Sequence, residues 1–179
     1  MKSHGWSAVS YADLAKRVGI RTASIHHHFP TKADLGRVLV RRYSAGFQGQ
    51  LSDIRSVGDD PAQHLRAYSG LVREAMGDGS GMCLCARFAA DYQNLPDPMR
   101  ILVAEFNEMN IDWLAGVLRD GVEQKVFHPI DDIGGEAESI FSEFQGAQLL
   151  ACSSVDVTRF DAVAGRLMLR ITAVQEAKT

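Results

Sequence analysis

Polar and apolar residues follow one another along the chain with the period of an α-helix. Near the C-terminal end, apolar side chains recur three and four residues apart, as on one helix face: Phe160, Val163, Ala164, Leu167, Ile171 and Val174. Helix-start signals precede other stretches: Ser10 with Asp13 resembles a capping box, as does Thr31 with Asp34. No segment shows the two-residue alternation of a strand. The pattern predicts an all-α fold.

Start and stop signals place the expected helices. They predict helices over about 11–18, 22–28, 32–56, 61–76, 82–93, 98–124, 136–152 and 158–175. Asp60–Pro61 and Asp97–Pro98 each set an N-cap residue before a proline at the first helical position. The glycine-rich segment 77–81 predicts a flexible break, and 126–135 predicts a loop.

Composition narrows the class of protein. The chain has 179 residues, 46% of them hydrophobic and 23% charged, which is typical of a globular protein and excludes wholesale disorder. No apolar run reaches the roughly 18–20 residues of a membrane span, and no secretory signal opens the sequence. Three cysteines, an odd number, fit a reducing compartment. These features predict a cytoplasmic protein without membrane contact.

Charge is divided unevenly along the chain. The net charge is −3, but residues 1–50 hold eight Lys or Arg against Asp13 and Asp34, which leaves +6. Residues 51–179 hold the other eleven basic and twenty acidic residues and carry −9. A basic first segment on an acidic remainder predicts that residues 1–50 bind a polyanion.

The first two predicted helices fit a helix–turn–helix. A three-residue turn, Gly19 to Arg21, separates 11–18 from 22–28, and Gly19 can adopt the positive φ that such a turn needs. Ala15 leaves room where the two helices would cross. Apolar side chains expected to face inward or to fill the corner are Leu14, Ala15, Val18, Ile20, Ile25 and Phe29. The outer face of 22–28 is polar and could reach bases and phosphates in a major groove.

Residues 11–35, from Tyr-Ala-Asp-Leu-Ala-Lys-Arg-Val to Phe-Pro-Thr-Lys-Ala-Asp-Leu, resemble the DNA-binding signature of TetR-type transcriptional regulators. The resemblance extends over about 7–43. It implies an all-helical homodimer with an N-terminal DNA-binding head and a C-terminal domain that binds an inducer. We therefore expect a DNA-binding domain at 1–45 and an effector-binding and dimerisation domain at 46–179.

The resemblance also assigns DNA contacts. Base-edge contacts are expected from Thr22, Ala23, Ser24 and His27, and phosphate contacts from Arg21, His26, His28 and Lys32. Two positions depart from the family pattern: Arg21 replaces the usual Ser or Thr cap, and His26 replaces the usual phosphate-binding Tyr. The cap of helix 22–28 then comes from Thr22 or is lost, at a cost of about 1 kcal/mol.

The family pattern further implies a helix that precedes Gly5–Trp6 and completes the hydrophobic core of the head. Only four residues stand before Gly5. We therefore expect the DNA-binding domain to be N-terminally incomplete and Leu14, Val18 and Ile25 to be exposed.

Metal and enzyme chemistry find little support in the sequence. Adjacent histidines on a helix point about 100° apart, so His26, His27 and His28 cannot chelate one ion, and DNA contact is the better interpretation. The sequence has no phosphate loop, nucleophile elbow or zinc-helix motif. We expect no metal, no cofactor and no enzymatic activity.

Cys83 and Cys85 allow two interpretations. A thiol at a helix N-terminus near Arg87 could have a lowered pKa and sense oxidants or electrophiles. Cysteine is also a small apolar residue that packs well in a core. The first interpretation makes both residues redox candidates, whereas the second makes them structural.

Large side chains in the later helices could enclose an effector. The candidate pocket residues are Cys85, Phe88, Tyr92, Phe106, Met109, Asn110, Trp113, Phe144 and Gln148. Asn110 and Gln148 would orient the ligand, and Tyr92 and Trp113 would form its walls. The alternative is that these residues fill an ordinary helical core.

The last two predicted helices have more apolar surface than one small bundle can easily bury. The candidate dimer-interface residues are Ile140, Phe141, Phe144, Phe160, Val163, Leu167 and Ile171. The alternative is that they complete the core of the monomer.

Taken together, these features predict a dimeric, ligand-responsive transcriptional repressor released from a palindromic operator by a small-molecule effector. The long helix 32–56 would connect effector and DNA. Two alternatives stay open: a thiol-based redox regulator acting through Cys83 or Cys85, and a helical ligand-binding protein without DNA function. The charge division argues against the second.

Overall fold

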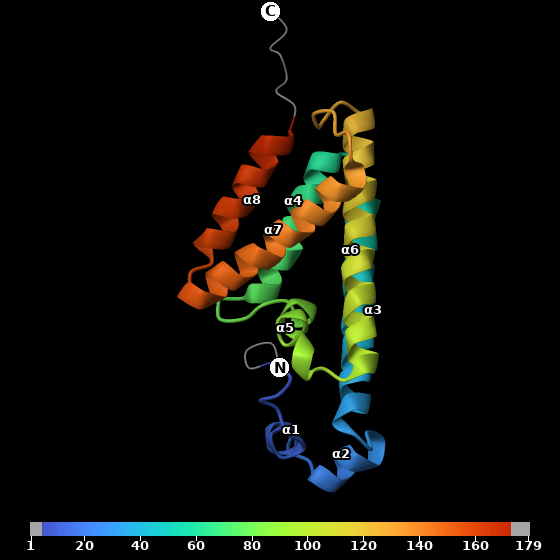
Figure 1. Cartoon of the computed structure of the whole chain (residues 1–179), viewed down its shortest axis with the longest axis vertical. Coiled ribbons are helices and arrows are strands. Elements are labelled where there is room, and N and C mark those ends of the chain that lie inside the picture. Colours follow the sequence, from blue (N-terminus) through green and yellow to red (C-terminus); the bar gives the residue numbers. More distant parts are fainter. Residues whose placement is uncertain (1–4, 173–179) are drawn as a thin grey trace, which may run out of the picture.

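Local capping interactions define the first three helices of the computed structural model, which describes residues 5–172 (Figure 1). These helices are α1 (Tyr11–Val18), α2 (Thr22–His28) and α3 (Lys32–Ser56). Ser10 and Thr31 form the predicted capping boxes at the starts of α1 and α3. Gly19 ends α1 in the left-handed conformation, at φ 77°. The three N-terminal helices therefore have the predicted bounds.

The later helices complete an all-α fold, as predicted. They are α4 (Pro61–Met76), α5 (Leu84–Ala90), the 3₁₀ turn η1 (Tyr92–Asn94), α6 (Asp97–Glu123), α7 (Ile133–Ser154) and α8 (Thr158–Ile171). Within residues 5–172, extended pairing is limited to an isolated bridge between Phe127 and Thr172. None of the helices in this range combines the length and apolar character that a membrane span needs.

Three helices differ in their bounds from the prediction. The helix expected over 82–93 is shorter, because Cys83 is extended at its start and Asp91 ends α5 before η1. α7 begins three residues earlier than predicted, because the Asp132 carboxylate accepts the N–H of Gly135 at 2.9 Å. α8 ends at Ile171, and the predicted continuation through Val174 lies outside the described residues.

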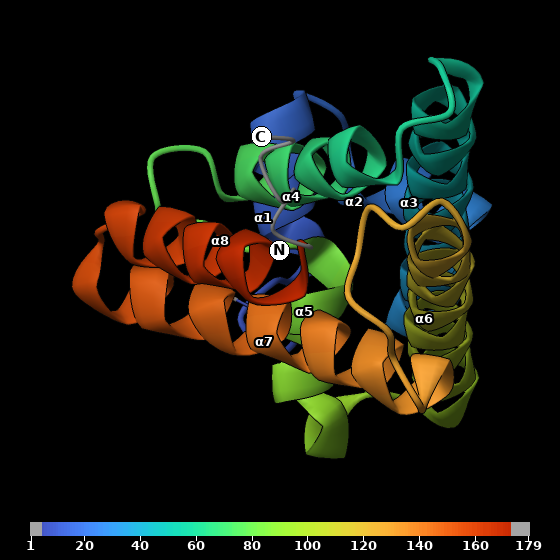
Figure 2. The ribbon, with the colours of Figure 1, turned by 90° about the horizontal axis from the view of Figure 1, so that it is seen from above.

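The helices form a small head and a larger body (Figures 1 and 2). α1, α2 and the start of α3 make the head at one end of the long axis. α3 and α6 run side by side along that axis, and α7 and α8 pack together across the body. α4 packs against α3, α6 and α8, while α5 lies between the head and the rest of the body.

Two hydrophobic cores correspond to this division. The head core consists of Tyr11, Ala15 and Ile25, with Leu14, Phe29 and Leu35 packed against it. The body core is larger and includes residues of every helix from α3 to α8. α3 belongs to both: Leu35 packs in the head, whereas Val40, Phe47 and Leu51 are buried in the body. The domain boundary expected at residue 45 falls inside this helix.

Buried polar groups in the body form hydrogen bonds with one another. The Tyr68 hydroxyl donates to Asn110 Oδ1 at 2.9 Å, and Asn110 Nδ2 donates to the Phe106 carbonyl at 2.7 Å. Gln148 Oε1 accepts the backbone N–H of Cys83 at 2.8 Å. Burial raises the pKa of Tyr68, because the phenolate would lose its hydration. These bonds fix α4 to α6 and the start of α5 to α7.

Candidate nucleic-acid interface

Hydrogen bonds cap both ends of α1, and those at its C-terminal end lead the chain into the turn before α2. Ser10 Oγ accepts the N–H of Asp13 at 3.1 Å, and the Asp13 carboxylate accepts the N–H of Ser10 at the same distance. The Ser10 hydroxyl also donates to the Asp13 carboxylate at 2.5 Å, and this bond, followed by the one from the Ser10 N–H, holds the pKa of Asp13 below its usual value. At the other end, the N–H of Gly19 donates to the Ala15 carbonyl at 2.9 Å. The exit direction of the chain toward α2 is thereby set.

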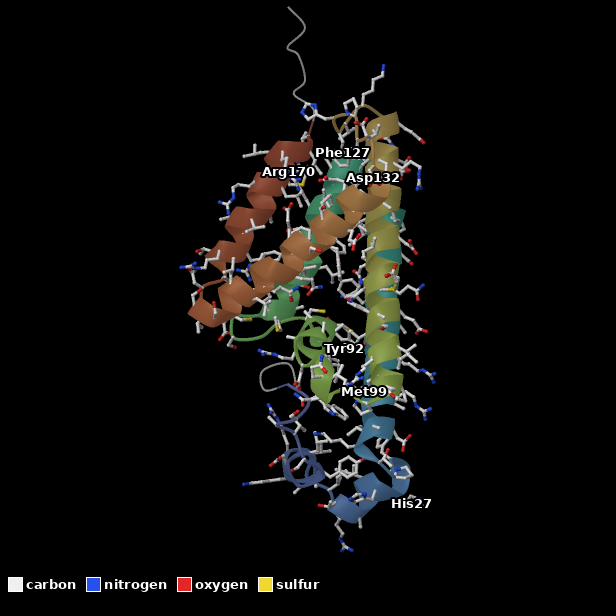
Figure 3. All side chains as sticks on the ribbon, viewed as in Figure 1. His27, Tyr92, Met99, Phe127, Asp132 and Arg170 are labelled. Atoms are coloured by element: carbon white, nitrogen blue, oxygen red, sulfur yellow. The ribbon has the colours of Figure 1, made fainter. Side chains whose placement is uncertain are left out.

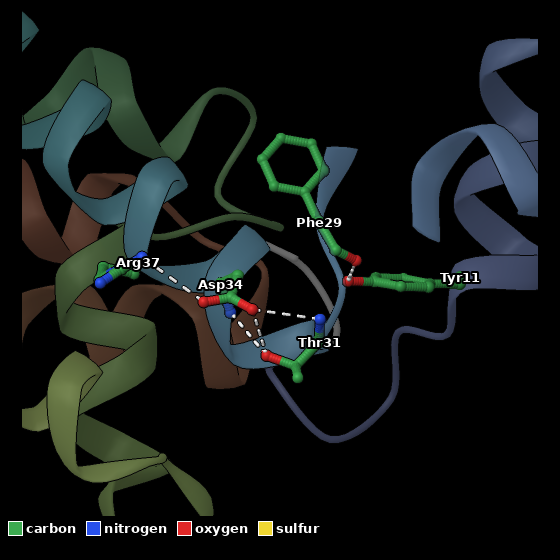
Figure 4. Close-up of polar contacts among 5 residues, drawn as sticks. All are labelled: Tyr11, Phe29, Thr31, Asp34 and Arg37. Carbon is green, nitrogen blue, oxygen red and sulfur yellow. Dashed lines mark hydrogen bonds and ion pairs between the residues drawn. The ribbon is translucent and has the colours of Figure 1, made fainter. Parts of the chain in front are cut away.

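Tyr11 connects the beginning of α1 to the end of α2. Its hydroxyl donates to the carbonyl of Phe29 at 2.8 Å (Figure 4), and its ring lies edge-on to His26, with 4.5 Å between the centroids. Next to it, the Thr31 hydroxyl donates to the Asp34 carboxylate at 2.7 Å and starts α3 (Figure 4). α2 is therefore fixed between two well-capped helices.

The apolar expectations for the head are met only in part. Ala15 and Ile25 are buried, and Leu14 and Phe29 are half-buried. Val18 is 65% exposed, so it does not face inward, whereas Ile25, expected to be exposed, is buried. Ile20, expected to fill the corner of the turn, is 47% exposed. That prediction is wrong, because no part of residues 5–172 covers this side of the turn.

The outer face of α2 is polar and accessible. Of the residues predicted to contact DNA, those from Arg21 to His28 are exposed: Arg21, Thr22, Ala23, Ser24, His26, His27 and His28. Figure 3 places His27 at the end of the molecule farthest from α8. Within residues 5–172, no group of three His, Cys, Asp or Glu side chains is arranged to hold a metal ion. The arrangement presents a helix N-terminus and three imidazoles to a binding partner.

Lys32, expected to contact a phosphate, contacts Trp6 in the structure. Its ammonium group donates to the Trp6 carbonyl at 2.7 Å and lies 4.5 Å from the centroid of the Trp6 ring. Desolvation lowers the pKa of Lys32, although the nearby Asp91 carboxylate opposes this shift. Lys32 therefore holds the segment before α1, and its contact with a phosphate stays a prediction.

Comparison with known proteins agrees with this geometry. Residues 1–37 match the model of bacterial regulatory proteins of the tetR family. A transcriptional regulator of the TetR family from Agrobacterium tumefaciens is 34% identical, with a TM-score of 0.89 over 94% of this chain and 90% of that chain. The chain belongs to the TetR family.

Other solved TetR structures are also similar. A regulator from Legionella pneumophila is 29% identical, with a TM-score of 0.85 over 96% of this chain and 90% of that one. One from Rhodobacter sphaeroides shares the fold, with a TM-score of 0.89 over 96% and 92% at 21% identity. No curated protein matches the chain. Membership in this family of DNA-binding transcriptional regulators confirms the prediction that the protein is not an enzyme.

The residues predicted to form the effector pocket of this TetR protein do not surround one cavity. Cys85, Phe88 and Phe144 are buried in the body core, and Asn110 and Gln148 make the internal hydrogen bonds described above. Trp113 stacks on Tyr68 and donates to the Leu51 carbonyl at 3.2 Å. Tyr92 is exposed on η1, with the Arg100 guanidinium 4.9 Å from its ring centroid (Figure 3). The residues are thus divided between the core and the surface in this structure, and their role in an effector pocket stays a prediction.

Several hollows lie along α3, and two of them have volumes near 600 Å³. One, of about 590 Å³, separates α3 from α4 and is lined by Arg42, Tyr43, Gly46, Phe47, Gln50, Leu71, Glu74 and Ala75. The other, of about 600 Å³, lies between α3 and α6 and includes the predicted Phe106 and Met109. The residues missed by the prediction recur along one face of α3, as Tyr43, Phe47 and Gln50 do. That spacing was the signal that could have found them.

The cysteine positions correct the redox hypothesis for Cys85. Cys83 and Cys85 are both buried, and Cys83 Sγ accepts a hydrogen bond from the Tyr43 hydroxyl at 3.1 Å. Burial, followed by the charge of Cys83, raises the pKa of the Cys85 thiol. A sensor thiol needs a lowered pKa and access to solvent, and Cys85 has neither.

The predicted dimer residues are also placed in the core. Ile140, Phe141, Phe144, Phe160, Leu167 and Ile171 are buried within the single chain, and Val163 is half-buried. These side chains hold α7 and α8 on the body, which corrects their assignment to a dimer surface. The exposed apolar residues of the same two helices are others: Leu149, Leu150 and Leu169.

α2 has no side-chain cap, and a serine should supply one. Arg21 is the N-cap residue and makes no capping hydrogen bond. We expect Arg21→Ser to raise the free energy of unfolding by about 1 kcal/mol, because a serine hydroxyl can accept an N–H of the first turn. The same change should lower the slope of log affinity against log salt by about 1 if Arg21 contacts a phosphate.

Denaturant unfolding and DNA titrations at several salt concentrations measure both effects. The matched control is Arg17→Ser, which removes the same charge from the exposed last turn of α1. Equal stability of Arg21→Ser and the wild-type protein would contradict the expectation.

Proposed function

We propose that this TetR-family regulator is a dimeric repressor that a small-molecule effector releases from a palindromic operator. The observation that carries the proposal is the double role of α3. Its first turns pack in the head beside α2, and its later turns line the two hollows described above. A molecule that binds in a hollow therefore contacts the helix that supports the DNA-reading helix.

DNA recognition rests on charge and accessibility. Residues 1–50 carry +6, and the exposed face of α2 combines hydroxyl and imidazole groups. Hydroxyl and imidazole groups can bond to base edges, while the basic residues around them attract the phosphate backbone. α2 is the element that would enter the major groove.

Dimerisation is supported by exposed leucines on α7 and α8. Leu149 and Leu150 lie on α7, and Leu169, which is 83% exposed, lies on α8. Gly146 and Gly165 add small residues with open space beside them. Small residues between leucines let two helix pairs approach closely, as in a four-helix bundle around a two-fold axis.

The hollow between α3 and α4 suits an effector. Its volume of about 590 Å³ falls in the usual range for small-molecule sites. Aromatic rings of Tyr43 and Phe47 lie beside the charged groups of Arg42 and Glu74, so the site fits an aromatic molecule with a polar end. An effector shifts the protein only by its differential affinity for the two conformations, typically by 1–3 kcal/mol.

Fluorescence anisotropy tests the DNA half of the proposal. Duplexes enriched from a randomised library by the full chain are titrated at about 50 and 200 mM salt beside an unrelated duplex. We expect affinity to fall at least about 100-fold between these concentrations, because several phosphate contacts release counterions. His27→Ala should lower the affinity for the enriched duplex about tenfold. His128→Ala, an exposed histidine on the loop after α6, is the control and should change nothing. Equal affinity for both duplexes would contradict the proposal.

The effector half is tested by filling the hollow. Gly46→Leu should place a side chain in the space between α3 and α4, where a Cβ meets no atom within 4 Å. A panel of aromatic carboxylates and amines is screened for release of the enriched duplex. Compounds that dissociate the wild-type protein from the duplex should dissociate Gly46→Leu only weakly. They should dissociate Gly49→Leu as they do the wild type, because Gly49 lies on α3 outside the hollow. Equal action on all three proteins would exclude this site.

A further inference from the structure

Trp6 occupies a position between the head and the body. Its side chain is 5% exposed and belongs to the body core, although α1 of the head follows only a few residues later. The indole lies edge-on to Phe88 of α5, with 6.1 Å between the centroids. It also lies against Gly36 of α3, where a Cβ would come within 2.7 Å of the ring and would also meet Met99 of α6. Gly36 therefore leaves the space that the indole fills.

Hydrogen bonds hold this segment from both sides. On the body side, the Asp91 carboxylate accepts the N–H of Trp6 at 3.1 Å, and the N–H and hydroxyl of Ser7 at 3.4 and 3.5 Å. On the other side, the Lys32 ammonium donates to the Trp6 carbonyl at 2.7 Å. Lys32 is the first residue of α3, and Asp91 directly follows α5. The three residues Trp6, Lys32 and Asp91 thus form a clamp that joins the two parts.

The clamp gives the head a second attachment besides α3. A head held by one helix could turn about the axis of that helix and could bend with it. A second point of attachment, displaced from the axis, restricts both motions. Tyr92 and Met99, labelled in Figure 3, mark the level of this junction, between the body above and α1 and α2 below. The direction in which α2 projects therefore depends on the clamp.

We propose that Trp6, Lys32 and Asp91 are positioning residues for DNA recognition, because they set the orientation of α2 relative to the body. The clamp acts on the DNA-binding function of the family and requires no effector. Asp91 makes the sharpest test. Removing its negative charge should by electrostatics alone strengthen binding to DNA, so a loss of affinity indicates a change in orientation.

The test uses the fluorescence of Trp6. The chain has two tryptophans, so Trp113→Phe leaves Trp6 as the sole tryptophan reporter in a parent protein. In this parent, Asp91→Ala should shift the Trp6 emission to longer wavelength and increase its quenching by acrylamide, because the ring becomes more accessible. Affinity for the enriched duplex should fall about tenfold. Far-UV circular dichroism should show unchanged helix content.

Asp78→Ala is the matched control. Like Asp91, Asp78 accepts a backbone N–H, from Ser80 at 2.9 Å, but Asp78 is exposed and lies in the loop after α4. It should change neither the emission nor the affinity. Lys32→Met separates positioning from phosphate contact: positioning predicts loss of affinity together with the emission shift.

Three results would overturn the proposal: unchanged Trp6 emission in Asp91→Ala, an emission shift with undiminished affinity, or a loss of affinity in Lys32→Met without an emission shift. Failure of DNA recognition itself is distinguishable, because it would appear as absent binding by the wild-type protein and by the Trp113→Phe parent.

Discussion

Replacing Leu150 and Leu169 by glutamate is expected to leave the chain folded but monomeric. Leu150 is 52% exposed and Leu169 is 83% exposed, so neither substitution disturbs the core. In the proposed dimer, each change would bury unpaired carboxylates at the centre of the interface, which costs several kcal/mol. In a dimer, binding of one head holds the second head close to its half-site and so raises the overall affinity. The monomer should therefore bind the enriched duplex at least about 100-fold more weakly.

Sedimentation equilibrium at micromolar concentration gives the mass, and anisotropy gives the affinity. The matched control is the double variant Ile101→Glu with Val57→Glu, which changes two equally exposed apolar residues away from α7 and α8. It should stay dimeric. A dimeric Leu150→Glu, Leu169→Glu protein would show that these two leucines do not lie in the interface.

Phe144→Ala is expected to reduce the free energy of unfolding by about 3–5 kcal/mol. The Phe144 ring is 1% exposed and stacks on Phe160 at 5.5 Å between the centroids, with Tyr68 at 5.7 Å. Alanine leaves a cavity among three helices that cannot all move inward. The loss is large beside the roughly 5–15 kcal/mol that stabilises an ordinary domain.

Urea unfolding at one fixed protein concentration measures this effect, because the stability of a dimer depends on concentration. Leu149→Ala, on the exposed side of the same helix, should cost less than about 1 kcal/mol. A small loss for Phe144→Ala would mean that the ring lines a cavity or an interface after all.

The helices of this protein could be predicted from its sequence because their signals are local. The capping boxes at Ser10 and Thr31 and the left-handed Gly19 depend on residues at most four positions away. The reading face of α2 follows from the same local pattern. The shortened α5 could not be predicted in this way, since Cys83 is held extended by Gln148, 65 residues later.

The places of the candidate pocket and interface residues could not be predicted for a related reason. A phenylalanine with helical spacing is equally suited to a core, a cavity wall or a dimer surface, and only the packing of other helices distinguishes these places. Phe144 was assigned to two of them and lies in the third. Trp6 gave no signal, because its partner Asp91 is 85 residues away.

The separation of buried and exposed residues within α2 affects how the protein can evolve. Of its seven residues, Ile25 alone is buried, and His26 packs against Tyr11, whereas the others are exposed. If α2 reads DNA as proposed, mutations of these exposed residues would change which sequence is read at little cost in folding. A duplicated copy of the gene could acquire a new operator by a few substitutions there, without compensating changes elsewhere in the chain.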